Sequence, residues 1–131
     1  MHAVEVKNGF HWVGAVDWAI RDFHGYATPR GTSYNNYLIL DDEVTLLDTV
    51  KHDFWEYSRK NIVSLVDPGQ IRHVVINHIE NDPATGLPKL MALGPEATVH
   101  ITSPGRTCLG RFFHRSAWAG HIAPPGDPRT P

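Results

Sequence analysis

The stretch I-R-H-V-V-I-N-H-I-E-N-D-P-A-T-G, residues 71–86, decides the fold and locates the candidate site. Its first half is typical of a strand over 71–78, and the unbroken V-V-I run predicts burial on both faces. Its second half is polar and carries His78, Glu80 and Asp82, each two residues apart. Extended chain points such side chains in the same direction. The stretch therefore predicts a buried strand that delivers three ligand-type side chains into one loop.

Strand and helix signals alternate on both sides of this stretch. Strands are predicted over 2–18 (an edge hairpin that turns at Asn8-Gly9), 34–40, 43–48 and 97–102. Helices are predicted over 52–66, 85–94 and 105–115. In the second helix Thr85 is the expected N-cap and Pro88 lies in the first turn, while 21–33 is expected to be a loop. This order indicates an α/β fold, in which ligands gather at the carboxyl ends of strands.

The composition excludes several classes of protein. The chain has 131 residues, enough for one domain, and a formal net charge of −2, which does not favour nucleic acid as a partner. No apolar stretch is long enough to span a membrane, and the N-terminus lacks a signal-peptide pattern. Cys108 is the single cysteine, so no disulfide forms within the chain. We expect a cytoplasmic protein in which Cys108 is a small buried residue.

The loop after residue 78 combines one histidine with two carboxylates, a set that favours iron, zinc or manganese. A polar loop with a helix-capping acid would show the same spacing, so the spacing alone leaves both interpretations open. Asp48 ends a predicted strand and is expected to orient a ligand or to terminate that strand. His24, in the F-H-G-Y segment, could line a substrate pocket. The other histidines show no ligand spacing: His2, His11, His52, His73, His100, His114 and His121.

Several longer motifs occur in an order that resembles one family. They are V-G-A-V-D-W (13–18), F-H-G-Y-A-T-P-R-G-T-S-Y-N-N-Y-L-I-L (23–40), L-L-D-T-V (46–50) and N-H-I-E-N-D (77–82) followed by G-L-P (86–88). From about residue 4 to about residue 118 the chain resembles the flavodiiron proteins, also called A-type flavoproteins. The resemblance implies an α/β (α+β) fold over 1–118, roughly the first half-unit of a metallo-β-lactamase-like αββα sandwich. Residues 119–131 are proline-rich and are expected to form a disordered tail.

The resemblance also implies an oxidoreductase. Proteins of this family reduce dioxygen to water, or nitric oxide to nitrous oxide, at a non-haem di-iron site. The electrons come from FMN in a flavodoxin-like domain. A rubredoxin or a flavin reductase passes electrons to this FMN. His78, Glu80 and Asp82 match the first three positions of the family's ligand motif H-x-E-x-D-H, and Pro83 departs from the fourth.

The family's later iron ligands and its FMN domain have no counterpart in these 131 residues. We therefore expect a truncated or degenerate flavodiiron-type segment that is inactive as an isolated chain. A half sandwich would expose an apolar sheet face, which favours a homo-oligomer or a complementing chain. Two alternatives stay open: a metal-dependent hydrolase of the metallo-β-lactamase type, and a non-catalytic remnant that binds metal. Glu80 argues against the hydrolase, whose motif H-x-H-x-D-H has histidine at that position.

Overall fold

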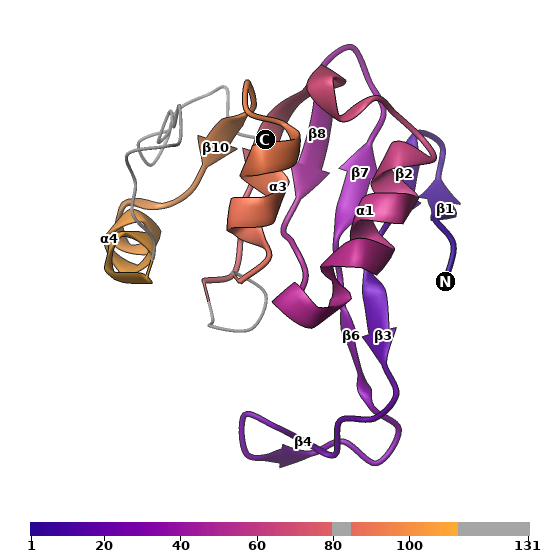
Figure 1. Cartoon of the computed structure of the whole chain (residues 1–131), viewed down its shortest axis with the longest axis vertical. Helices are drawn as coiled ribbons and strands as arrows, with labels where there is room; N and C mark the ends of the chain where they lie inside the picture. Colours follow the sequence, from indigo (N-terminus) through magenta and orange to yellow (C-terminus); the bar gives the residue numbers. More distant parts are fainter. Residues whose placement is uncertain (80–84, 113–131) are drawn as a thin grey trace.

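A mixed sheet of six strands organises the structure, a computed structural model that describes residues 1–79 and 85–112 (Figure 1). In order across the sheet the strands are β1 (Val4–Lys7), β2 (Phe10–Trp12), β7 (Tyr37–Ile39), β8 (Val44–Leu47), β9 (Ile71–Val75) and β10 (Thr98–His100). Strands β1, β2, β7 and β8 pair antiparallel, whereas β8, β9 and β10 run parallel. The predicted edge hairpin and the predicted α/β order of strands and helices are confirmed.

Two small ribbons extend from one end of this sheet (Figure 1). Strand β3 (Ala15–Asp17) pairs with β6 (Thr32–Tyr34), and β4 (Asp22–Phe23) pairs with β5 (Tyr26–Ala27). The segment 21–33, predicted to be a loop, thus contains two-residue strands. The predicted strand over 34–40 is interrupted at Asn35-Asn36. Asn36 is fully buried there, and its side-chain amide donates to the hydroxyl of Ser58 at 3.2 Å.

The helices lie on one face of the sheet or beyond its edge. They are η1 (His52–Phe54), α1 (Trp55–Val63), η2 (Pro68–Gln70), α3 (Leu87–Leu93) and α4 (Ser103–Phe112). Figure 1 shows α1 and α3 in front of the sheet and α4 beyond β10. Within the described ranges, no helix is long and apolar enough to cross a lipid bilayer.

Two details at these helices differ from expectation. Thr85 does not cap α3, because the N-cap is Gly86 and the Thr85 hydroxyl instead accepts the backbone N–H of His52 at 2.9 Å. Cys108 was expected to be buried but is exposed on α4, where Leu109 is the residue that turns into the core. In both cases the local residue preference is overridden by how the helix packs against the rest of the fold.

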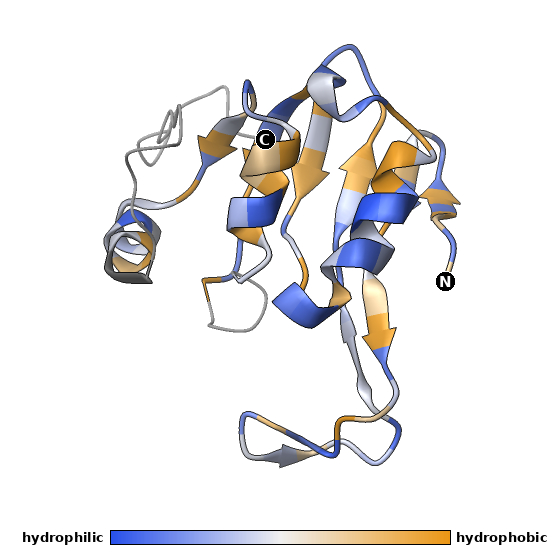
Figure 2. Cartoon of the chain, viewed as in Figure 1, coloured by the Kyte–Doolittle hydropathy of each residue, from blue (hydrophilic) through white to orange (hydrophobic). Residues whose placement is uncertain are grey.

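The sheet has one buried face, which the helices cover. Leu38, Leu46, Val74 and Val99 occupy the same register position on four adjacent strands. Their side chains are at most 3% exposed. They share one core with residues of α1 and α3: Trp55, Ile62, Leu87, Leu90 and Met91. Figure 2 shows apolar residues along the central strands and a mixture of apolar and polar residues along these helices. The core therefore lies between the sheet and this single layer of helices.

The opposite face of the sheet is only half-buried. The next register row holds Trp12, Tyr37, Leu47, Val75 and His100, and each of these residues keeps part of its surface in solvent. The prediction that the strand in 71–78 is buried on both faces is therefore wrong. From His73 onward, side chains of β9 alternate between the helix-covered face and this second face, which no described helix covers. Association through this face stays a prediction.

The two faces predict unequal costs for neighbouring substitutions in β7. Leu38→Ala should lower the free energy of unfolding by about 2–5 kcal/mol, because it leaves a cavity beneath the helices. Ile39→Ala should cost about 1 kcal/mol, because the half-exposed Ile39 side chain has less buried area to lose. Urea denaturation followed by circular dichroism would measure both. Equal losses would contradict a sheet with a single buried face.

Candidate metal centre

The candidate site begins where two parallel strands end side by side. Asp48 follows β8 directly, and its backbone N–H donates to the carbonyl of Val75, the last residue of β9, at 2.7 Å. Asp48 has a φ of +57°, in the left-handed region. Aspartate tolerates this conformation better than most residues other than glycine. The turn at Asp48 directs its carboxylate toward the loop that leaves β9.

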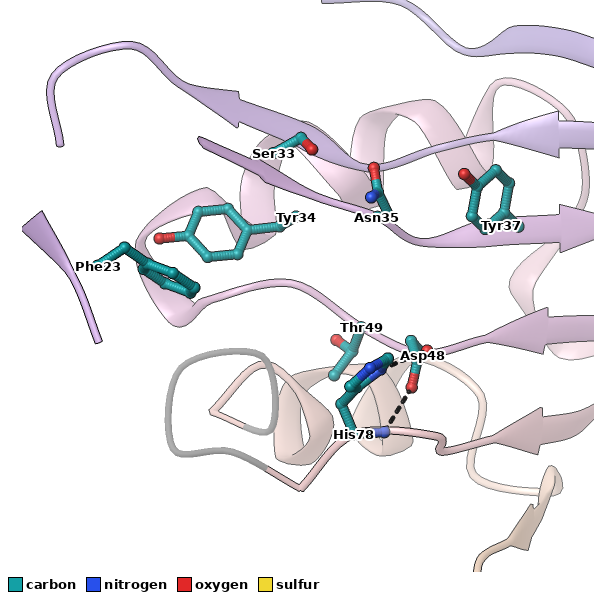
Figure 3. A pocket seen from close by; sticks show the side chains of 8 residues that line it. All are labelled: Phe23, Ser33, Tyr34, Asn35, Tyr37, Asp48, Thr49 and His78. Carbon is teal, nitrogen blue, oxygen red and sulfur yellow. Dashed lines mark hydrogen bonds and ion pairs between the residues drawn. The ribbon is translucent and has the colours of Figure 1, made fainter. Parts of the chain in front are cut away.

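The Asp48 carboxylate fixes that loop through backbone and side-chain hydrogen bonds (Figure 3). Its Oδ1 accepts the backbone N–H of Asn77 at 2.6 Å and that of His78 at 3.2 Å. Its Oδ2 lies 3.2 Å from the side-chain nitrogen of Asn77 and 3.3 Å from Nδ1 of His78. Backbone and imidazole of His78 are therefore held by the same side chain. The expectation that Asp48 orients a ligand residue agrees with this geometry.

The contact with Asp48 also sets the chemistry of the His78 ring. When Nδ1–H donates to a carboxylate, the lone pair of a neutral imidazole is on Nε2, which is the arrangement of metal-binding histidines. The His78 side chain is 65% exposed, whereas Asp48 is 14% exposed. His78 therefore offers an accessible nitrogen donor that is held by a mostly buried carboxylate.

Glu80 and Asp82, the two predicted carboxylate ligands, lie outside the described residues. Within 1–79 and 85–112, no group of three or more histidine, cysteine, aspartate or glutamate side chains is close enough to hold a metal. The structure thus places His78 and leaves the ligand set of His78, Glu80 and Asp82 as a prediction.

A cavity of about 330 Å³ adjoins His78. Figure 3 shows aromatic rings on one side and the polar groups of Asp48, Thr49 and His78 on the other. Its walls are Phe23, Ser33, Tyr34, Asn35, Tyr37, Asp48, Thr49 and His78. The Thr49 hydroxyl is buried and has no hydrogen-bond partner among the described residues. A buried polar oxygen of this kind is suited to a ligand or a water in the cavity.

His24 is close to this cavity but is not among the residues that line it. Its ring packs edge-on against Phe23, with ring centroids 4.2 Å apart, and Phe23 forms the wall. His24 is exposed and has a φ of +53°. Its role as a pocket residue therefore stays a prediction. Sequence reasoning missed Thr49 and the aromatic wall, although Thr49 directly follows Asp48 in L-L-D-T-V.

Comparison with known proteins confirms the resemblance over nearly the whole chain. An anaerobic nitric oxide reductase flavorubredoxin from Pectobacterium carotovorum is 41% identical over 127 residues, which are 95% of this chain and 25% of that protein. The rubredoxin oxygen:oxidoreductase of Desulfovibrio gigas superposes with a TM-score of 0.89 at 38% identity, covering 96% of this chain and 32% of that one. The flavodiiron protein of Giardia intestinalis gives a TM-score of 0.87 at 34% identity, with 94% and 30% covered.

The similarity covers nearly all of this chain but only part of each relative. The chain spans between about a quarter and a third of the length of these relatives, and it corresponds to their N-terminal, metallo-β-lactamase-like part. The predicted fold class is confirmed, because the similar structures cover nearly all of the chain. No family model matches the sequence.

Neutralising Asp48 tests its role in the loop. Asp48→Asn keeps a side chain that tolerates positive φ but removes the charge that strengthens the hydrogen bonds from Asn77 and His78. We expect the free energy of unfolding to fall by about 1–2 kcal/mol. Asp41→Asn, in the exposed turn before β8, is the matched control and should cost less than about 0.5 kcal/mol. Indistinguishable urea midpoints for the two variants would contradict this role.

Proposed function

We propose that this chain carries the first ligand loop of a flavodiiron-type centre, with His78, Glu80 and Asp82 as iron ligands. The observation that carries the proposal is the Asp48 carboxylate, which holds the backbone and the ring of His78 at once. Metal-binding histidines usually donate their second ring nitrogen to a carboxylate in this manner. A carboxylate with a purely structural role would need only the backbone contacts.

The residues present fit a non-haem iron. Imidazole nitrogens and carboxylate oxygens suit first-row divalent metals, and His78 and Asp48 both line the cavity of about 330 Å³. When bound, a pair of irons supplies the electron-transfer chemistry that reduces dioxygen or nitric oxide. The relatives include both a nitric oxide reductase and an oxygen:oxidoreductase, so both gases are proposed substrate classes.

The chain's own residues have three tasks in this proposal. Asp48 orients the His78 ring, while Phe23 and Tyr34 form an apolar wall that suits a small, weakly polar gas. Thr49 contributes to the wall of the cavity, and its buried hydroxyl has no hydrogen-bond partner among the described residues. None of these side chains can store electrons, so reduction depends on the metal and on an external electron source.

Further parts of the catalytic unit would come from outside residues 1–131. We assign 1–118 to the metal-binding domain and 119–131 to a tail that takes no part in it. The half-exposed face of the sheet could accept a second copy or a complementing chain. A rubredoxin-type protein or a flavin reductase would supply electrons through FMN. We place this reaction in the cytoplasm. Residues 1–131 alone are therefore proposed to bind iron without turnover.

Anaerobic titration of the 131-residue protein with Fe²⁺, followed by elemental analysis, tests the ligand set. We expect at most one weakly held iron per chain and at least about tenfold weaker binding in His78→Ala and in Glu80→Ala. His52→Ala, a change of an exposed histidine in η1, is the matched control and should bind as the unaltered protein does.

The outcomes separate the alternatives. If His78→Ala and Glu80→Ala leave iron binding unchanged, the proposal is overturned. That result would favour the non-catalytic remnant, in which the loop is not a specific metal site. Two irons per chain, both lost in His78→Ala, would confirm the ligand loop and show that self-association supplies the remaining ligands. Consumption of dioxygen or nitric oxide could then be measured with a chemical reductant.

A further inference from the structure

Two histidines that lie far apart in the sequence meet on the half-exposed face of the sheet. His73 of β9 and His100 of β10 are diagonal neighbours, because His73 is in register with Thr98 and His100 with Val75. Nδ1 of His73 lies 2.9 Å from Nε2 of His100, and the two ring planes are inclined by 57°. Strand β10 is the last strand of the sheet, so the pair lies at its margin.

A carboxylate holds the other nitrogen of the first ring. Oε2 of Glu43, just before β8, lies 2.8 Å from Nε2 of His73. When this carboxylate accepts Nε2–H, a neutral His73 has its lone pair on Nδ1, the nitrogen that faces His100. The side chains of His73 and Glu43 are 28% and 71% exposed. His73 is therefore partly open to solvent, and its Nδ1 lone pair is available to bind a metal ion.

The distance between the two facing nitrogens suits a shared metal ion. Two Zn–N bonds of about 2.1 Å that meet at about 90–110° separate their nitrogens by about 3.0–3.4 Å. The 2.9 Å separation between His73 and His100 is close to this range, so small ring rotations would turn both lone pairs toward one ion. In the metal-free pair, His100 Nε2–H donates to His73. Metal binding at both nitrogens requires that this proton leave Nε2 of His100.

We infer that His73 and His100 form a second metal site, which takes a late first-row divalent cation such as Zn²⁺. Glu43 is a positioning residue that fixes the His73 tautomer, as carboxylates do for many metal-binding histidines. Two imidazoles supply only part of a tetrahedral shell, and water completes it. Imidazole donors favour zinc, nickel and copper ions over the hard cations Mg²⁺ and Ca²⁺. This site is separate from the His78 loop and does not depend on the proposed function.

Zinc titration of the protein with ¹⁵N-labelled histidine tests the site directly. A His78→Ala, Glu80→Ala background removes the loop site. We expect the ring resonances of His73 Nδ1 and His100 Nε2 to move together and to saturate at one Zn²⁺ per chain. This measurement is made without altering the pair, so it does not depend on whether a variant of the pair folds.

Substitutions of the pair and of its support provide the second test. His100→Ala should weaken zinc binding at this site at least about tenfold, and Glu43→Ala about tenfold. His11→Ala, which alters a half-buried histidine of β2, is the matched control and should leave zinc affinity unchanged. The inference is overturned if Zn²⁺ leaves the two ring signals in place, or if they saturate at different concentrations. The pair is then only a hydrogen-bonded contact.

Discussion

The Asp48 carboxylate joins the ends of two parallel strands, and the geometry of the candidate site depends on it. Its turn adopts a left-handed conformation, which costs about 1 kcal/mol for a residue other than glycine. Hydrogen bonds to a charged acceptor contribute about 1.5–3 kcal/mol each. Two backbone bonds, from Asn77 and His78, therefore outweigh the cost of the turn. The strained conformation persists because it brings the carboxylate to these donors.

The difference between the two faces of the sheet is a second constraint. After a register shift at the start of β8 and β9, residues on β7, β8, β9 and β10 lie in common rows, so the register decides which side chains meet the helices. The helix-covered face is closed by Leu38, Leu46 and Val74, whereas Tyr37, Leu47 and Val75 on the other face stay partly in solvent. One layer of helices can stabilise the sheet. The second face is apolar enough to accept a further layer, which is why association is a natural expectation.

Much of the element order could be predicted from the sequence, because it follows from local patterns. Periodicity and turn residues located the edge hairpin, the helix after Asp48 and the parallel strands. The break at Asn35-Asn36 could not be predicted in this way, since Asn36 is held by Ser58, 22 residues later. Contacts between elements that are distant in the sequence do not produce a recognisable spacing of residues along the chain.

The candidate site shows the same division. Asp48 and His78 are each the last residue of a predicted strand, so the rule that ligands gather at carboxyl ends of strands was enough to bring them together. His73 and His100 had no ligand spacing, because the register between β9 and β10 alone makes them neighbours. A spacing rule detects ligands that share one loop. It misses ligands that face each other across two strands.

In both histidine sites a carboxylate accepts a hydrogen bond from the histidine ring, but the two carboxylates differ in exposure. Asp48 accepts from Nδ1 of His78, while Glu43 accepts from Nε2 of His73, so each carboxylate leaves the opposite ring nitrogen as the donor. Asp48 is 14% exposed and also binds backbone, whereas Glu43 is 71% exposed and makes its contact from the protein surface. Water and salt screen an exposed pair more strongly than a buried one. Both rings are therefore held before an ion binds, the His78 ring at 3.3 Å by a mostly buried carboxylate and the His73 ring at 2.8 Å by an exposed one.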